Sequence, residues 1–302
     1  MTANKIHNSL EQLIDTLTIT ENQKIFLQEK ANNLFNKLKA ISQNQIPYWS
    51  SLYLSKNTYQ YIIDRFWFGG TFDRGLFIKN RFDVDVYFVY KKEKPDPFEQ
   101  NNITKSLLFE LLYSNLKVYE YNQKENMKIL RNPPYKHAIP IRIDYSGISI
   151  LFDCIPALEL LNGNYLIPGG KKGIKKINQA LEEQTLFKLN KKQNGKINKL
   201  LILMKYWNFN WGKPLKRDIT ERLIEYIFDK IEISSWDRAV KTFFTQAIRI
   251  INNKKFLPDR VNEHYSILDE YPSNELKNFL EIFREAKKYA QNGEWKKIFS
   301  NL

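Results

Sequence analysis

Residues 66–90 read FWFGGTFDRGLFIKNRFDVDVYFVY, and the rest of the chain can be arranged around this stretch. From Asp83 to Tyr90 apolar and polar residues alternate, and β-branched and aromatic residues dominate, which predicts a strand. Residues i and i+2 of a strand share a face, so Asp83 and Asp85 point the same way, about 6–7 Å apart. Like charges at this spacing repel, and a divalent metal between them is the usual reason to place them there. The alternative is that the two carboxylates only form the solvent face of an edge strand.

The break before this strand, Gly69-Gly70-Thr71, is suited to a phosphate. Glycines allow positive φ and a close approach of the backbone, so that N–H groups can face an anion. The threonine hydroxyl adds one more donor. We therefore expect a phosphate-binding turn just ahead of the two carboxylates.

A third acidic residue interrupts a later apolar strand, in the segment ILFDCIPA at 150–157. An unpaired buried carboxylate is costly, so Asp153 needs a metal or a basic partner. Together with the turn and the Asp-x-Asp strand, Asp153 favours a metal site over a solvated strand face. The adjacent Cys154 is expected to be a buried, inert thiol.

Length and composition indicate a globular protein with two domains. The chain has 302 residues, of which 43% are hydrophobic. Its polar N-terminus and its lack of a long apolar run predict neither a signal peptide nor a membrane span, and we expect a cytoplasmic protein. The net charge of +14 favours anionic partners such as nucleotides or nucleic acid, although a lysine-rich solvated surface would also produce it.

Periodicity predicts mixed structure up to about residue 168 and helices after it. In the first part we expect helices at 5–17, 20–42 and 103–116, with Thr20 and Gln23 forming a capping box. Besides 83–90, strands are expected at 127–130, 138–144 and 148–155, whereas residues 55–66 fit either a helix or an extended segment. The second part should hold helices at 177–188, 195–208, 219–231, 235–252 and 274–291. We therefore expect domains at 1–168 and 169–302 with a cleft between them, a common place for a ligand.

These motifs resemble the polymerase-β-like nucleotidyltransferase superfamily. Within it, ILFDCIPA and the segment INKLLILMKYWNFNWGKPL at 197–215 resemble the CD-NTases, the bacterial relatives of cyclic GMP-AMP synthase and of the oligoadenylate synthetases. The resemblance covers about residues 20–290. The chain departs from the family where it has Gly-Gly-Thr in place of the commoner Gly-Ser, and where Arg260 replaces a proline after FLPD. It also lacks the cysteine-based zinc insertion of the animal DNA sensor.

The resemblance implies an α+β fold, with a polymerase-β-like core of mixed sheet and helices plus a C-terminal helical domain. It also implies catalysis by two Mg²⁺ or Mn²⁺ ions. Asp83 and Asp85 would bridge both ions, and Asp153 would complete the site on the side of the nucleophile. Gly69, Gly70 and Thr71 would hold the β- and γ-phosphates of the substrate.

Two further nucleotide-binding residues follow from the Lys-Tyr-Trp motif. The resemblance implies that Lys205 contacts phosphate, whereas a lysine in the last turn of a helix can also serve only the helix dipole. Tyr206 and Trp207 could stack on a base, and a role in the core is equally open for Trp207. Arg74 and Lys79 either bind phosphate or are solvated.

The predicted function is the synthesis of a cyclic or linear oligonucleotide second messenger from NTPs, ATP being expected among them, in antiphage defence. A downstream effector would bind the product, and RNA is a possible activator. The alternatives are an RNA-directed nucleotidyltransferase of the CCA-adding or poly(A) type, which shares the three carboxylates, and an RNA-activated enzyme like the 2′-5′-oligoadenylate synthetases. A non-enzymatic RNA-binding module would be expected to have lost one of the carboxylates, and all three are present.

Overall fold

The structure is a computed structural model in which the chain forms two compact units. One unit comprises residues 20–73 and 80–179, and the other comprises residues 1–19, 74–79 and 180–302. The described residues are 3–44, 61–69, 72, 83–92, 104–122, 127–131, 133–135, 137–145, 148–160, 163–169, 173–212, 214–215, 217–253, 256–259, 264–300 and 302.

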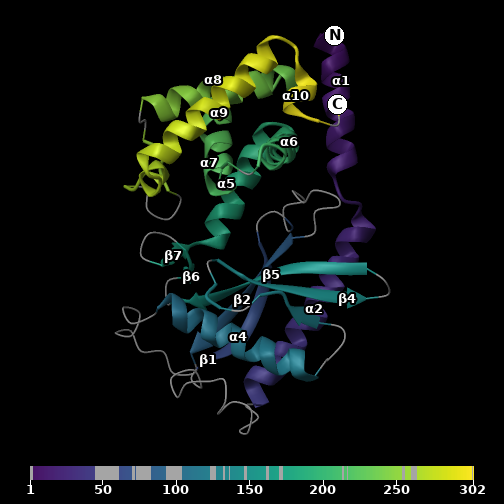
Figure 1. The fold of residues 1–302 in the computed structure, drawn as a ribbon, viewed down its shortest axis with the longest axis vertical. Coiled ribbons are helices and arrows are strands. Elements are labelled where there is room, and N and C mark those ends of the chain that lie inside the picture. The colour runs from purple at the N-terminus through teal and green to yellow at the C-terminus, as the bar shows by residue number, and fades with distance from the viewer. Residues whose placement is uncertain are drawn as a thin grey trace. The chain divides into compact units, whose positions relative to one another are not determined.

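The first unit is built on a mixed sheet with the strand order β1-β2-β5-β4-β3, in which β6 pairs with both β5 and β7 (Figure 1). Strands β2 and β5 are parallel, and the other pairs are antiparallel. The strands are β1 (Tyr61–Phe68), β2 (Asp83–Lys92), β3 (Met127–Ile129), β4 (Ile139–Tyr145), β5 (Ile148–Glu159), β6 (Tyr165–Pro168) and β7 (Ile174–Ile177).

The expected strands are confirmed, and the ambiguity at 55–66 is resolved as β1 from Tyr61 onward. Tyr145 pairs with Ile148, so the antiparallel strands β4 and β5 form a hairpin. The sequence analysis missed β6 and β7. Each has only four residues, and IKKI in β7 lacks the alternation that identifies a longer strand.

Helices α2 (Glu21–Asn44) and α4 (Lys105–Asn122) lie on one side of this sheet, as Figure 1 shows. The predicted capping box begins α2: the Thr20 N–H donates to Gln23 Oε1 at 3.0 Å, and the Gln23 N–H donates to Thr20 Oγ1 at 3.3 Å. From α4, Asn115 donates to the buried hydroxyl of Tyr90 at 3.2 Å. The even-numbered residues of β2 face these helices, so its odd-numbered residues, Asp85 among them, belong to the opposite face.

The second unit is helical. Its core is rich in aromatic rings: Trp207 is fully buried and packs against Phe244 and Phe283, with ring centroids 4.9 and 5.7 Å away. The elements of this unit are α1 (Ala3–Leu17), α5 (Gln179–Lys192), α6 (Lys196–Asn210), α7 (Arg217–Phe228), α8 (Trp236–Asn252), η2 (Ile267–Glu270), α9 (Ser273–Gln291) and α10 (Trp295–Ile298).

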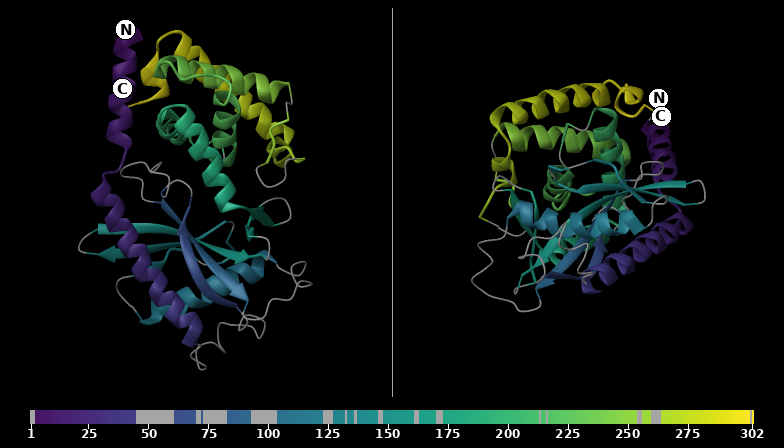
Figure 2. Two further views of the ribbon diagram at one scale, coloured as in Figure 1. Left: turned by 180° about the vertical axis from the view of Figure 1, so that it is seen from behind. Right: turned by 60° about the horizontal axis from the view of Figure 1, so that its bottom comes forward.

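Helix α1 packs with the helices of the second unit, beside α8 and α6 (Figure 2). Its apolar face, which includes Leu10 and Ile14, belongs to the same core as Trp207. By contacts, therefore, residues 1–19 group with residues 180–302, whereas the sequence analysis placed them with residues 20–168. Among the described residues, no helix has the length and the apolar character needed to cross a membrane.

Candidate active site

Three neighbouring strands bring Gly69, Asp85 and Asp153 into one row across the sheet. Asp85 of β2 and Asp153 of β5 are register partners in the parallel pair. Gly69 directly follows β1, and its N–H donates to the carbonyl oxygen of Asp85 at 2.7 Å. Residues 69, 85 and 153 are distant in sequence, so the pairing of the strands is what assembles this row.

The carboxylates of Asp85 and Asp153 project from the same face of the sheet. Both side chains are partly exposed, whereas their neighbours Val86 and Cys154 are fully buried on the opposite face. Neighbouring strands lie about 4.8 Å apart, so two negative charges are close together at this point. A pair of carboxylates that is not enclosed in the core offers the oxygen ligands that Mg²⁺ and Mn²⁺ prefer.

The close contact at Gly69 shows why this position requires glycine. A Cβ added there would lie 2.3 Å from Asp85 Cβ and 3.1 Å from Asp85 Oδ2. The described glycines with positive φ do not include Gly69. A side chain here would displace the Asp85 carboxylate, so close packing rather than a positive φ requires glycine at this position. The predicted contact of Gly69 with phosphate stays a prediction.

The turn after β1 is closed by a hydrogen bond from the Phe72 N–H to the Gly69 carbonyl oxygen at 2.9 Å. Phe72 is fully buried and packs on Phe68, with ring centroids 4.5 Å apart, and this contact anchors the turn. Gly70 and Thr71 lie outside the described residues, so their predicted contacts with phosphate stay predictions.

Asp83 is the first residue of β2, and its backbone is in register with Leu151. Its side chain lies outside the described part of the structure. The described side chains thus supply two of the three predicted metal ligands, and among them no group of three or more acidic, histidine or cysteine residues forms a metal site. Arg74 and Lys79 also lie outside the described residues.

Cys154 follows Asp153 and is fully buried on the other face of β5. Burial raises the pKa of the thiol well above its ordinary value, and the nearby negative charge of Asp153 raises it further. The thiol is therefore protonated at neutral pH, which confirms the predicted inert role.

The carboxylate face of the sheet continues into an aromatic cluster and then a polar network, neither of which was predicted. Trp67 stacks on Tyr87 with centroids 5.2 Å apart and meets Tyr165 at 4.6 Å. Arg65 is paired with Val89, four residues along β2 from Asp85, which corresponds to about 13 Å. Because these residues are distant in sequence, no local pattern marks the cluster.

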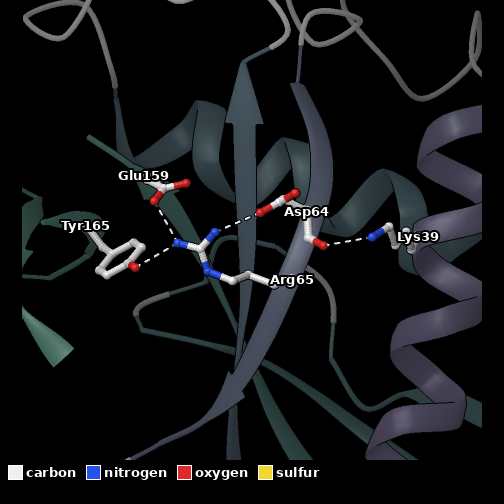
Figure 3. Close-up of polar contacts among 5 residues, drawn as sticks. All are labelled: Lys39, Asp64, Arg65, Glu159 and Tyr165. Carbon is white, nitrogen blue, oxygen red and sulfur yellow. Dashed lines mark hydrogen bonds and ion pairs between the residues drawn. The ribbon is translucent and has the colours of Figure 1, made fainter. Parts of the chain in front are cut away.

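The Arg65 guanidinium joins three strands, as Figure 3 shows. It donates to Asp64 Oδ2 at 2.7 Å on its own strand, to Glu159 Oε1 at 2.6 Å on β5, and to the Tyr165 hydroxyl at 2.9 Å on β6. The hydrogen bond to Glu159 is the main reason that the pKa of Arg65 is raised. Lys39 of α2 donates to the Asp64 carbonyl oxygen at 2.9 Å. The network connects β1 to β5, β6 and α2, at a place on the sheet away from Gly69, Asp85 and Asp153.

In the helical unit, the Lys-Tyr-Trp residues of α6 have three different environments. Trp207 is a core residue, which decides between the two predicted roles. Tyr206 is only 3% exposed and stacks on Phe299 at 6.5 Å. Its ring therefore contributes to the core, and the predicted contact of Tyr206 with nucleotide stays a prediction. Lys205 lies beside Glu221 of α7, with 3.7 Å between Nζ and Oε1.

Comparison with known proteins agrees with this architecture. No family model matches the chain. A protein of Bacillus cereus described as a probable cyclic nucleotide synthase is 23% identical over 267 residues, covering 77% of this chain and 80% of the relative.

Solved structures show the same fold. CdnC of E. coli MS115-1 with ATP superposes with a TM-score of 0.71 at 15% identity, covering 97% of both chains. The cyclic AMP-GMP synthase DncV of Vibrio cholerae, a prokaryotic cGAS homolog, superposes with a TM-score of 0.64 at 14% identity, covering 93% of this chain and 88% of DncV. The predicted fold class and the predicted resemblance to the CD-NTases are therefore confirmed.

Proposed function

We propose that this protein is a nucleotidyltransferase that makes a cyclic oligonucleotide from NTPs. The observation that carries the proposal is the row in which Asp85 and Asp153 lie side by side on parallel strands, with Gly69 packed against Asp85. The chain also has the fold of CdnC and DncV and is similar in sequence to a probable cyclic nucleotide synthase. These three observations support one enzyme class.

In the proposed reaction, a ribose hydroxyl of one nucleotide attacks the α-phosphorus of another. A new P–O bond forms, the bond to the β-phosphate oxygen breaks, and pyrophosphate leaves with the electron pair. The hydroxyl proton is lost to solvent. Repetition of this step extends the chain, and attack by the terminal hydroxyl on the 5′ α-phosphate of the same molecule closes the ring.

Asp85 and Asp153, joined in our proposal by Asp83, would hold two divalent ions through carboxylate oxygens. Such ions lower the pKa of the attacking hydroxyl and neutralise the charge of the leaving phosphates. The two described carboxylates are fixed by the backbone register of β2 and β5, so their separation does not depend on flexible side chains. Gly69 packs so closely against Asp85 that a side chain at this position would displace the carboxylate.

The remaining assignments concern the phosphates of the substrate. We assign the β- and γ-phosphates to the turn at residues 69–71, whose first residue is tied to Asp85 by a hydrogen bond between backbone atoms. Lys205 is the cation of α6 that we assign to the triphosphate.

Product analysis tests the proposal. The protein is incubated with all four NTPs and Mg²⁺, and the products are separated and identified by mass spectrometry. We expect small cyclic oligonucleotides from the wild-type protein and none from Asp85→Asn. Linear products alone would favour an enzyme like the oligoadenylate synthetases. Extension of an added RNA, with no product from NTPs alone, would favour the RNA-directed alternative and contradict the proposal.

Activation by RNA remains part of the proposal as a possible means of regulation. Lys188, Lys191 and Lys192 of α5 are exposed, as a surface for a polyanion requires, but Lys192 already pairs with Asp229 at 3.0 Å. Product formation with and without double-stranded RNA, in the wild type and after changing Lys188 and Lys191 to Glu, tests this idea. Equal rates in all four conditions would exclude it. A role in antiphage defence and a downstream effector also belong to the proposal.

A further inference from the structure

The orientation of the Asp85 carboxylate depends on more than the register of the strands. Register makes Asp85 and Asp153 partners across the parallel pair and so fixes where their side chains begin. The direction in which the Asp85 oxygens point is set by rotation about the Cα–Cβ bond, which has three staggered positions. A misplacement of about 1 Å at a catalytic group can cost about 100-fold in rate. The residues that border this side chain therefore affect the site.

The ring of Tyr87 borders the Asp85 carboxylate. Tyr87 lies two residues after Asp85 on β2, so both side chains project from the same face of the sheet. A Cβ added to Gly69 would lie 3.0 Å from Tyr87 Cε2 and 3.1 Å from Asp85 Oδ2. The ring and the carboxylate thus border the same point beside Gly69, which any other residue would fill with its own side chain.

Trp67 supports the ring of Tyr87 from the neighbouring strand. The two residues are register partners in β1 and β2, and their rings stack with centroids 5.2 Å apart and an angle of 8° between the planes. Tyr165 of β6 packs against Trp67 in turn, at 4.6 Å. Tyr87 is 9% exposed, so its ring cannot swing away from Gly69 without losing the contact with Trp67.

The apolar surroundings of Tyr87 explain only part of this arrangement. Tyr87 belongs to a small cluster of buried residues that includes Ile155, Ala157 and Ile177, and an aliphatic side chain could also pack there. The Cε2 atom that reaches Gly69 lies one bond beyond the last atom of a leucine side chain. Packing in the cluster therefore requires an apolar residue, whereas contact with Gly69 requires a ring.

We propose that Tyr87 is a positioning residue whose ring, supported by Trp67, keeps the Asp85 carboxylate in the orientation that binds a divalent cation. This inference rests on the proposed function. Tyr87 acts through Asp85 rather than on the substrate, and the ring rather than the hydroxyl carries the role. Without the ring, the carboxylate gains room to rotate, and the metal ligands are less well preorganised.

The next residue of the same strand provides a matched control. Phe88 is fully buried, pairs with Phe66 of β1 and belongs to the opposite face of the sheet, away from Gly69. Tyr87→Leu and Phe88→Leu each remove an aromatic ring from β2, and both should lower stability because each leaves a cavity. Only Tyr87→Leu removes a group that borders the Asp85 carboxylate.

The experiment compares Tyr87→Leu, Tyr87→Phe, Trp67→Leu and Phe88→Leu with the wild type, at a temperature at which each is folded. The affinity for Mn²⁺ alone is measured from the electron paramagnetic resonance signal of the free ion, and kcat and KM are measured with NTPs and Mg²⁺. We expect Tyr87→Leu to lower the Mn²⁺ affinity and kcat by about tenfold or more, as for other residues that orient metal ligands.

The KM of Tyr87→Leu for NTPs should stay within about threefold of the wild-type value, because the change acts on the reacting centre more than on substrate binding. Tyr87→Phe and Phe88→Leu should retain the wild-type Mn²⁺ affinity and kcat. Trp67→Leu, which leaves Tyr87 in place and removes the ring behind it, should show a smaller loss in the same direction as Tyr87→Leu.

Three results would overturn the inference: wild-type Mn²⁺ affinity and kcat in Tyr87→Leu, an equal loss in Tyr87→Phe, or an equal loss in Phe88→Leu. If Tyr87→Leu does not fold, Trp67→Leu takes its place, and wild-type Mn²⁺ affinity in that variant would overturn the inference. A wild-type protein that binds Mn²⁺ but makes no oligonucleotide from NTPs would instead contradict the proposed function, because the Mn²⁺ comparison does not depend on turnover.

Discussion

Two charged pairs, one in each unit, are built in opposite ways. Asp85 and Asp153 carry the same charge, are partly exposed, and are held together by the backbone register of two parallel strands. Lys205 and Glu221 carry opposite charges, are buried, and are brought together by the packing of side chains between two helices. Like charges on partly exposed side chains favour binding of a cation, whereas a buried pair of opposite charges is already neutral. The first pair therefore favours a bound cation, whereas the second joins α6 to α7.

The strongest test of this comparison is Asp85→Asn. We expect NTP turnover to fall by about a thousandfold or more, because a lost metal ligand removes several kcal/mol of transition-state stabilisation. The melting temperature without metal should stay the same or rise, since repulsion from Asp153 is relieved. Asp144→Asn is the control: Asp144 lies on β4 of the same sheet, is 40% exposed, and pairs with Arg142. Normal turnover by Asp85→Asn with Mg²⁺ would contradict the assignment of the site.

Gly69→Ala tests whether the register of β2 and β5 is sufficient to position the Asp85 carboxylate. The added Cβ would meet Asp85 Cβ at 2.3 Å, so the strands or the carboxylate must shift. We expect turnover to fall by about a hundredfold and the free energy of unfolding to fall by about 1–3 kcal/mol, as for overpacking elsewhere. Activity assays and urea denaturation measure the two effects.

Gly163→Ala is the control for the cost of replacing a glycine. Gly163 has a φ of 73° and no atom within 4 Å of an added Cβ. Its replacement should lower stability by about 1 kcal/mol through backbone strain and leave turnover unchanged. If both alanine variants lost stability and neither lost activity, the contact between Gly69 and Asp85 would have no role in the site.

Arg65→Met tests the polar network shown in Figure 3, which lies on the same sheet but away from the carboxylate row. The side chains of Arg65 and Glu159 are 42% and 25% exposed, so solvent screens their interaction. We expect the free energy of unfolding to fall by about 1 kcal/mol, with turnover within about twofold of the wild type.

The control for this variant is Arg142→Met. Arg142 pairs with the carboxylate of Asp144, and its side chain is 42% exposed, as is that of Arg65. The effect of Arg142→Met on the free energy of unfolding should be smaller, because Asp144, the partner of Arg142 among the described residues, lies on the same strand. A large loss of activity in Arg65→Met, with little loss of stability, would mean that the site extends farther along the sheet than we propose.

The smallest expected effect concerns Glu11, which joins α1 to the rest of the helical unit. Partial burial acts to raise the pKa of Glu11, but hydrogen bonds from Lys199 and Trp236 outweigh it and hold the pKa below 4.5. A lowered folded-state pKa contributes stability above pH 4.5, and this contribution is lost as pH falls through the folded-state value. Glu11→Gln should thus be slightly less stable than the wild type at pH 7.

The pH dependence of that difference is the decisive measurement. Urea denaturation of the wild type and of Glu11→Gln, at pH 7 and at several pH values below 4.5, should show the two stabilities converging in acid. If the difference in the free energy of unfolding were constant across this range, the packing of the Glu11 side chain, rather than its charge, would attach α1 to the helical unit.

The sequence by itself determined the strand with Asp83 and Asp85, the strand with Asp153, and the succession of helices after it. It could do so because alternation, helical spacing and capping boxes are local, and each is complete within a few residues. Resemblance to a known family was enough to predict the fold class. The sequence also drew attention to Gly69, but its close packing against Asp85 could not be predicted from the sequence.

Only the tertiary structure decided which of these residues meet. The register of β2 and β5 pairs Asp85 with Asp153, and the same pairing of strands puts Arg65 beside Glu159. In the helical unit, packing enclosed Tyr206 in the core and placed Glu221 beside Lys205. Sequence spacing carries no information on such contacts, because they depend on how distant segments dock and on which side chains lose their water when they do.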